Sequence, residues 1–363
     1  MKHLTIAGAV ATTALLLAHP ASAAGSWSEE HFPQLQDDGV LHTAAVGDDA
    51  AWAFGITNDA DHQHHSLAFR RGQQGWEQVP TPDIGRINAA SVVSRDDVWA
   101  VGDGTSMHWN GAEWREVPIV AQPEYSTSLS GVTAFGAEEV WNTGFGWRSD
   151  NRQTRSSVQH WDGRAWHEIA LPDLGIRSEL IGISGTSPND VWVAGAKPTD
   201  LGPDGKLGGL LLHWDGERWD EQPLVEIPGM HVQLRDVHAL APDDVWAVGY
   251  QHPGNIDRRP VAAHWDGTRW SLAPVPDELG QLNDVVQVGD ELRAVGYSVE
   301  KSPYVLRYDG TSWQKVPAPA PSEGKYLNTY AGAVLDGRLL IVGVEADVDD
   351  PTSTRPYAAT HGD

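Results

Sequence analysis

The stretch from Leu234 to Gly249 decides the fold, because its pattern repeats along the whole chain. Its second half reads Asp244-Val245-Trp246-Ala247-Val248-Gly249, and six copies of this segment, three close and three weaker, align with it. When the tryptophan or its equivalent is the anchor, the seven segments lie at positions 52, 99, 141, 192, 246, 293 and 340. Regular recurrence of this kind indicates a repeat architecture.

A second block follows these segments, and one of its clearest copies is His264-Trp265-Asp266-Gly267 with a further tryptophan at Trp270. Asp-Gly or Asn-Gly between apolar residues predicts a β-hairpin, since glycine tolerates the positive φ of a type I′ turn. Each unit therefore predicts four short strands, A to D. Strand B carries Val-Trp, strand C carries His-Trp, and strand D starts at the second tryptophan. Further copies of the block begin at Phe69, His108, His160, His213 and Arg307.

A four-stranded unit repeated about every 40–50 residues is typical of a β-propeller blade. Helical periodicity is absent after residue 24, so we predict an all-β fold, a seven-bladed β-propeller. The seventh unit ends at Asp363 without a strand D, whereas the segment from Trp27 to Pro33 is similar to the other D strands. We therefore expect this N-terminal strand to close the last blade. An open or six-bladed ring would leave both features unexplained.

The first residues are typical of an export signal. Lys2 and His3 precede an apolar run from Leu4 to Ala18, and Ala21-Ser22-Ala23 fits the small-residue cleavage rule. The run is shorter than the roughly 20 residues that span a bilayer, so no membrane insertion is expected. We predict a signal peptide over residues 1–23, cleavage after Ala23, a propeller over residues 24–363 and a secreted protein.

The composition excludes several classes of function. With 50 acidic and 25 basic residues the net charge is −25, and an acidic chain repels nucleic-acid phosphates. The absence of cysteine excludes disulfides, a thiol nucleophile and a thiolate zinc site. We expect a monomer that binds no nucleic acid.

Sixteen of the 17 tryptophans occupy repeated positions on strands B, C and D, which predicts packing between blades rather than chemistry. The same holds for His108, His160, His213 and His264, since each would stand in a different blade. Trp147 is the exception, because it lies outside the repeat.

The B–C and D–A connections vary in length and share one rim of a propeller, which we name the top face. Variable loops on a rigid scaffold are the usual carriers of binding. Aromatic and cationic side chains there suit a sugar, a carboxylate or a peptide. A solvated loop that folds over its own side chains is the alternative for each group. The candidate ligand-binding residues are Trp147, Arg148 and Arg152 on blade 3, and Tyr250, His252 and Arg258 on blade 5.

A polar funnel at the top of the central channel is the default ligand site of a propeller. Residues at the start of strand A should ring it, and Asp236 and Asp284 follow one step later. Within this set His42, Arg235, Asp236 and Asp284 are the candidate binding residues, although an ion pair between Arg235 and Asp236 is equally consistent with the sequence. The predicted ring is His42, Asn88, Ser130, Ile181, Arg235, Asn283 and Tyr330.

We expect no cofactor, with one alternative at the seam between blades 1 and 7. Histidine and carboxylate together can hold a divalent cation, and the B–C loops that meet there are rich in both. Exposed loops of this composition also occur without a metal. The residues concerned are His62, His64, His65, Asp347 and Asp349.

The units, such as Leu234-Arg235-Asp236-Val237 through Val245-Trp246 to His264-Trp265-Asp266-Gly267, resemble those of secreted bacterial β-propeller repeat proteins. They are also similar to tectonin-type propellers, a family that includes carbohydrate-binding lectins. The resemblance covers residues 27–363 and rests on scaffold residues, so what it implies is the fold. The Asp-Gly-x-x-Trp turn lacks one residue of the sialidase Asp-box, and a galactose-oxidase-type crosslink needs a cysteine.

Two functions remain. The first is a secreted, non-catalytic binding protein that uses its top-face loops for a carbohydrate, peptide or cell-surface ligand. The alternative is a secreted hydrolase or lyase that works in the central funnel through His42, Asp236, Asp284 or a seam metal. No catalytic motif stands out, so we favour binding.

Overall fold

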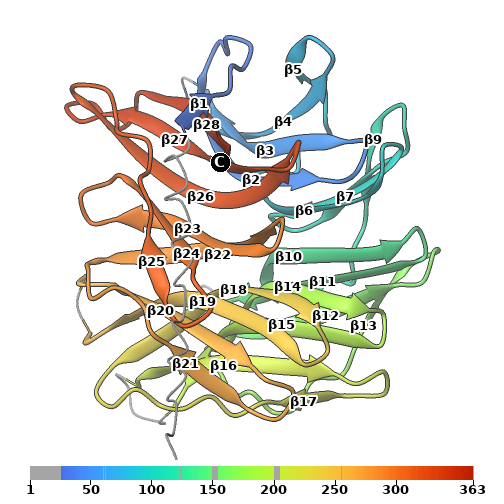
Figure 1. The fold of residues 1–363 in the computed structure, drawn as a ribbon. Coiled ribbons are helices and arrows are strands. Elements are labelled where there is room, and N and C mark those ends of the chain that lie inside the picture. The colour runs from blue at the N-terminus through green and yellow to red at the C-terminus, as the bar shows by residue number, and fades with distance from the viewer. Residues whose placement is uncertain are drawn as a thin grey trace, which may run out of the picture.

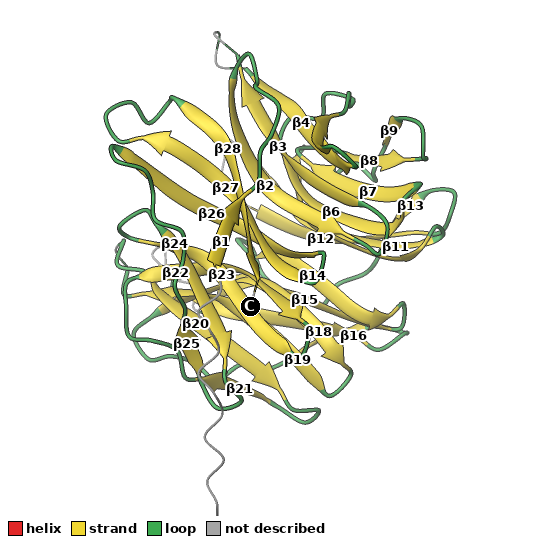
Figure 2. Ribbon diagram, turned by 45° about the horizontal axis from the view of Figure 1, so that its top comes forward, coloured by secondary structure: helices red, strands yellow, loops and turns green. Residues whose placement is uncertain are grey.

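The computed structural model describes residues 26–59, 61, 63–122, 124–148, 154–199, 205–254 and 256–362. The predicted signal peptide therefore lies outside the described residues. Within them the chain forms seven antiparallel four-stranded sheets and no helix (Figures 1 and 2). Each inner strand contacts the inner strand of the next sheet, and β26 contacts β2, so the ring is closed. The predicted seven-bladed β-propeller is confirmed.

The blades share one order of strands, from A at the channel to D at the outside. The A strands are β2 (Asp38–Val46), β6 (Ile87–Ser94), β10 (Ser126–Gly136), β14 (Glu179–Ser187), β18 (His231–Ala241), β22 (Gly280–Val288) and β26 (Lys325–Leu335). The B strands are β3 (Ala51–Asn58), β7 (Asp97–Gly102), β11 (Glu139–Trp147), β15 (Asp190–Pro198), β19 (Asp244–His252), β23 (Glu291–Ser298) and β27 (Arg338–Asp347).

The two outer positions complete each blade. The C strands are β4 (His64–Gly72), β8 (Ser106–Trp109), β12 (Thr154–Trp161), β16 (Leu207–Trp214), β20 (Arg259–Trp265), β24 (Pro303–Tyr308) and β28 (Thr354–Gly362). The D strands are β5 (Gly75–Gln78), β9 (Trp114–Val117), β13 (Trp166–Glu168), β17 (Trp219–Glu221), β21 (Trp270–Ala273), β25 (Trp313–Lys315) and, from the other end of the chain, β1 (Ser26–Glu29).

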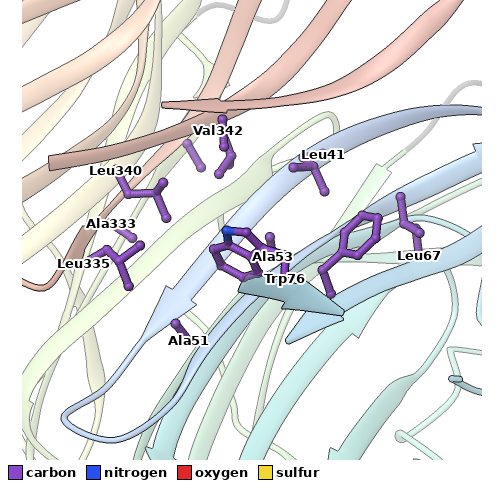
Figure 3. Packing of buried hydrophobic residues seen from close by; sticks show 12 residues of the cluster. Leu41, Ala51, Ala53, Leu67, Trp76, Ala333, Leu335, Leu340 and Val342 are labelled. Carbon is purple, nitrogen blue, oxygen red and sulfur yellow. The ribbon is translucent and has the colours of Figure 1, made fainter. Parts of the chain in front are cut away.

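The N-terminal strand closes blade 7, as predicted. β1 pairs antiparallel with β28, with Trp27 opposite His361 (Figure 1). Just after β1, the Glu30 carboxylate accepts hydrogen bonds from Arg71 at 2.8 Å and from the Trp76 indole at 3.0 Å, both in blade 1. Figure 3 shows the apolar core of this seam, where Trp76 lies among residues of blades 1 and 7. The closing segment therefore joins blade 7 to blade 1.

The tryptophans hold successive blades together. The ring centroid of Trp192 on strand B of blade 4 lies 5.2 Å from that of Trp265 and 5.5 Å from that of Trp270, both in blade 5. Tilted and edge-on pairs at this spacing are favourable beyond the area that they bury. The same arrangement joins Trp52 to Trp109 and Trp114, Trp99 to Trp161 and Trp166, Trp141 to Trp214 and Trp219, and Trp246 to Tyr308 and Trp313.

The repeated histidines support these tryptophans within each blade. His213 stacks on Trp192 at 4.1 Å, and its Nε2 lies 2.7 Å from an Asp190 carboxylate oxygen at the start of the same strand B. The other three histidines make the matching pair of contacts, which confirms their predicted structural role. They are His108 with Trp99 and Asp97, His160 with Trp141 and Glu139, and His264 with Trp246 and Asp244.

The C–D turns differ from the expected type I′ form. In blade 3 Trp161 pairs with Trp166, which leaves a four-residue loop in which Gly163 has a φ of 86° and Asp162 does not have a positive φ. A type I′ turn needs positive φ at both central residues. Here the Asp162 carboxylate instead accepts the backbone N–H groups of Arg164 and Ala165, both at 2.9 Å. The side-chain cap makes a second positive φ unnecessary.

Candidate functional site: the central channel and its mouth

Every A strand carries a β-bulge at the same position, and the extra residue lines the channel. In β18 the pairing shifts between Leu234 and Asp236, so that Arg235 is the bulged residue. Bulges aim a side chain out of the regular alternation of a strand. The seven bulged residues are those predicted to ring the funnel, and all seven line the channel: His42, Asn88, Ser130, Ile181, Arg235, Asn283 and Tyr330.

The channel encloses a cavity of about 680 Å³ with a mainly polar wall. Three residues that lie two positions before a bulge also line the cavity, namely Arg86, Ser128 and Glu179. None of these three residues was predicted from the sequence to line the channel. The period-two alternation of a strand was the available signal, because residues i and i−2 point to the same face.

The side chains of several channel residues form hydrogen bonds with the next blade. The amide nitrogen of Asn283 donates to the Thr329 carbonyl at 2.9 Å, and Asn88 makes the equivalent bond to Leu129 at 2.8 Å. Asp236 and Asp284 also bond to backbone N–H groups of the blade that follows each of them. The Val285 nitrogen donates to Asp236 at 3.0 Å, and the Gly332 nitrogen donates to Asp284 at 2.8 Å. These four side chains join successive A strands.

The carboxyl groups of the two aspartates also lie close enough to interact with each other. Burial raises the pKa of Asp236 well above its ordinary value of 3.8, and the neighbouring Asp284 raises it further. A raised pKa favours the protonated acid in the folded state. The protonated acid is thus the favoured form of Asp236, and in that form it can donate a hydrogen bond to Asp284. The expected ion pair between Arg235 and Asp236 is not present among the described contacts.

This arrangement predicts how stability depends on pH. Because the folded-state pKa of Asp236 is raised, its stabilising contribution is complete below about pH 4 and is lost as pH rises through the folded-state pKa. Asp236→Asn keeps an acceptor for Val285 and a donor for Asp284 but carries no charge. We expect the free energy of unfolding of this variant, measured by denaturant titration, to increase relative to that of the unsubstituted protein as pH rises from 4 to 8. A stability difference between the two proteins that stays constant across that range would contradict the raised pKa of Asp236.

Three cationic or imidazole groups at the mouth remain without such bonds. The Nε of Arg235 is buried and has no hydrogen-bond partner among the described residues, and the same is true of the Nε2 of His42. Burial lowers the pKa of His42 to about 3, with a further contribution from Arg86, so the imidazole is neutral at neutral pH. Arg86 is exposed and makes no side-chain hydrogen bond or ion pair within the described part of the chain. Such groups can bind an anion or a hydrogen-bond acceptor.

The predicted residues of blade 3 lie at the rim rather than in the channel. Trp147 is the last residue of β11 and is 40% exposed, with its ring 6.3 Å from that of Phe145. Arg148 forms an ion pair with Glu124 at 2.8 Å and lies over the Tyr125 ring. Arg152 lies outside the described residues. The charge of Arg148 is thus already compensated within its own blade.

The predicted residues of blade 5 belong to an internal polar network. Tyr250 is only 7% exposed, donates its hydroxyl to Gln233 and lies under the guanidinium of Arg258 at 4.5 Å. Arg258 in turn donates to Gln281 of blade 6. His252 stacks on His231 at 4.8 Å, and burial lowers the pKa of His252. These side chains shape the mouth and leave little free surface for a ligand.

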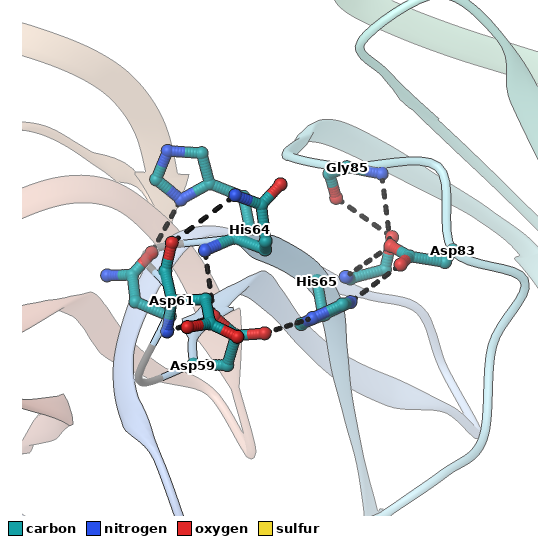
Figure 4. Close-up of polar contacts among 9 residues, drawn as sticks. Asp59, Asp61, His64, His65, Asp83 and Gly85 are labelled. Atoms are coloured by element: carbon teal, nitrogen blue, oxygen red, sulfur yellow. Dashed lines mark hydrogen bonds and ion pairs between the residues drawn. The ribbon is translucent and has the colours of Figure 1, made fainter.

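The predicted metal ligands at the seam make separate contacts (Figure 4). His65 lies between two carboxylates, with Nδ1 2.7 Å from Asp83 and Nε2 3.2 Å from Asp59, and its pKa is raised by these hydrogen bonds. His64 contacts Asn58 instead, at 2.5 Å. The described residues contain no group of three or more side chains placed to hold a metal ion. His62 lies outside them, so the metal site stays a prediction.

Asp347 and Asp349, on the other side of the seam, are also engaged within their own blade. Lys325 donates to Asp347 at 2.9 Å, and the Asp349 backbone nitrogen donates to the same side chain at 3.1 Å. The structure does not bring these two residues to His64 or His65 in any recorded contact.

Most of the exposed large apolar side chains lie on the top face. Seven large apolar side chains in the described residues are exposed, and six of them lie in B–C or D–A connections or at their edge. Ile256 is 88% exposed, and it lines a small groove beside the channel mouth together with Val299 and Tyr297. The seventh, Leu272, is on an outer strand. The six are Trp147, Ile176, Val225, Ile256, Val299 and Val348.

Comparisons with known proteins support the fold. No protein-family model matches the chain, and no curated protein matches it. Solved structures do match, among them one described as YCF48 bound to D1 peptide. It is 13% identical, has a TM-score of 0.56, and the alignment covers 94% of this chain and 96% of that chain. The likeness is one of fold.

None of the described residues forms a helix that could cross a membrane.

Proposed function

We propose that this is a secreted, non-catalytic binding protein that holds a peptide segment of a protein partner on its top face. The observation that carries the proposal is the arc of exposed apolar side chains around the mouth of the channel. Ile256 and Val299 share one groove beside that mouth, and apolar side chains that are exposed next to each other commonly mark an interaction site. The export-type segment from Leu4 to Ala18 supports secretion.

The chemistry of the arc favours a peptide over a sugar. Five of its six members are isoleucine or valine, and Trp147 is its only aromatic ring. Sugars bind to flat aromatic faces, whereas aliphatic side chains bury the apolar side chains of a peptide. The YCF48 structure, which has the same fold, is described as bound to a peptide, and this agrees with the proposal.

A selection from a random-peptide library tests the proposal, with affinities of the selected peptide measured by calorimetry. We expect the double variant Ile256→Ser, Val299→Ser to bind about tenfold more weakly or worse, since burial of two aliphatic side chains is lost. Leu272→Ser is the matched control, because Leu272 is exposed but lies on the outer strand β21. Its affinity should not change.

The proposal fails when the library yields no peptide, or when the double variant binds as tightly as the unsubstituted protein. A glycan array, run with Trp147→Ala beside the unsubstituted protein, covers the other predicted ligand class. Sugar binding that depends on Trp147 would assign the top face to a carbohydrate and overturn the peptide proposal.

A further inference from the structure

Arg235 is placed in the channel without an internal partner. The bulge in β18 turns it toward the channel, and its Nε is buried without a hydrogen bond to any described residue. No ion pair joins it to the residues that the structure describes. A half-buried guanidinium in this state is costly to the folded protein. A ligand that accepts hydrogen bonds from the guanidinium would offset this cost.

Arg86 is the second such group at the mouth. It lies in the connection before β6, at the channel lining, and makes no side-chain bond within the described residues. Its situation differs from that of most arginines on this acidic chain. Arg71, Arg155 and Arg259, for example, each form an ion pair with a nearby carboxylate.

The acidic groups around these arginines limit the charge of a ligand. Glu179 lines the same mouth; burial raises its pKa, and the nearby Arg235 acts in the opposite direction. Two arginines and one glutamate give a formal charge of +1, and the acidic pair of Asp236 and Asp284 on the same wall lowers the total further. His42 adds none at neutral pH. The site therefore suits a monoanion better than a dianion such as phosphate.

We infer that the mouth of the channel binds the C-terminal carboxylate of a peptide, with Arg235 and Arg86 as the groups that hold it. This deepens the proposed function and rests on it, since the rest of the peptide would lie across the apolar arc. A guanidinium and a carboxylate form two parallel hydrogen bonds, which fixes both position and orientation. The unpartnered Nε2 of His42 offers a further polar contact to the same ligand.

The shape of the channel favours the terminus of a peptide over an internal segment. Strands of all seven blades surround the cavity, so an internal peptide segment would have to bend into it and out again. A terminus enters end-on. The position one residue past the bulge holds Asp236 and Asp284, whose pair is acidic and already bonded to the next blades. The aspartate pair repels an anionic ligand from that part of the channel wall, so the ligand is held beside the arginines.

The test uses thermal unfolding of the full protein with two small probes, N-acetyl-Gly-Gly-Val as the free acid and as its C-terminal amide. At about 10 mM we expect the acid to raise the midpoint by about 1–2 °C and the amide to have no effect. Arg235→Gln and Arg86→Gln should each remove the shift. Arg164→Gln, on the opposite rim in a C–D turn, is the matched control and should keep it.

The stability of the unliganded variants separates a binding role from a structural one. Because Arg235 makes no hydrogen bond or ion pair with the described residues, Arg235→Gln should unfold at nearly the same temperature as the unsubstituted protein. Arg235→Lys should restore part of the acid-induced shift, since it keeps the charge but not the paired hydrogen bonds. A marked fall in the midpoint of Arg235→Gln would indicate a structural role and overturn the inference.

Other outcomes also overturn it. These are equal shifts with acid and amide, a shift that survives in Arg235→Gln, or a larger shift with inorganic phosphate than with the peptide acid. The two proposals can fail separately. If a library-selected peptide binds equally well after amidation, the peptide proposal stands and the carboxylate site falls. If no peptide is selected but the short acid still stabilises the protein through Arg235, the carboxylate site stands without the apolar arc.

Discussion

Deletion of residues 26–30 is expected to lower the thermal midpoint and to make the protein associate through the exposed edge of β28. Besides two long bonds from Thr360, the segment supplies strand D of blade 7 and four side-chain bonds of 3.0 Å or less to the rest of the ring. At roughly 1 kcal/mol each, these bonds alone amount to about 4 kcal/mol, a large share of the stability of a folded domain. The bonds are Trp27 to the Pro317 carbonyl, Arg355 to Glu29, and Arg71 and Trp76 to Glu30.

The midpoint should fall by about 5–10 °C, as measured by differential scanning calorimetry. Size-exclusion chromatography with light scattering should show association that increases with concentration, because an unpaired edge strand offers a template for another chain. A synthetic peptide with the sequence of residues 26–33, added in trans, should restore both properties by strand addition. An unchanged midpoint and unchanged elution would show that ring closure does not depend on β1.

Trp27 itself is expected to contribute less than the strand that carries it. The other six strand-D tryptophans are buried beside the preceding blade, and five of them meet a strand-B tryptophan there. The blade before Trp27 has Arg293 at that position, and Trp27 remains partly exposed, with its ring tilted against that of His361 at 4.9 Å. Backbone pairing and the bonds of Glu30, rather than the indole, therefore account for most of the closure.

The scaffold could be predicted from the sequence because its determinants are local and repeated. The alternation around Val245 and Trp246 and the Asp266-Gly267 turn specify strands within a few residues of one another. Their recurrence in register then implies equivalent positions in every blade. The ring of channel residues followed from the same register, although the β-bulge that places them was not evident.

The site was less accessible to sequence reasoning because its side chains depend on neighbours from other blades. Tyr250 looks like a free aromatic on a variable loop, yet it is covered by Arg258 and bonded to Gln233. Asp236 looks like a catalytic carboxyl group, yet it bonds to blade 6. These contacts join residues on different strands or blades, and they cannot be predicted from the spacing of residues in the sequence.

The largest single-residue effect on stability is expected at Trp192. Its indole is fully buried between blades 4 and 5, packs against Trp265 and Trp270, and donates a hydrogen bond to Asp190 at 3.2 Å. Trp192→Ala removes all of these contacts and leaves a cavity that the surrounding strands cannot fill. Substitutions of this kind cost about 3–5 kcal/mol. His213, which stacks on the same ring, loses its support as well.

Trp147→Ala is the matched control, since Trp147 has the same side chain at 40% exposure on the rim. Its free energy of unfolding should change by about 0.5 kcal/mol or less, measured with Trp192→Ala in parallel guanidinium titrations. Trp192→Phe should recover part of the loss, because a phenyl ring restores some packing but not the bond to Asp190. Equal losses for Trp192→Ala and Trp147→Ala would contradict the assignment of the repeated tryptophans to blade-to-blade packing. The expected difference arises because the repeated indoles fill the spaces between blades, whereas the indole of Trp147 stands at the face where we propose that a ligand binds.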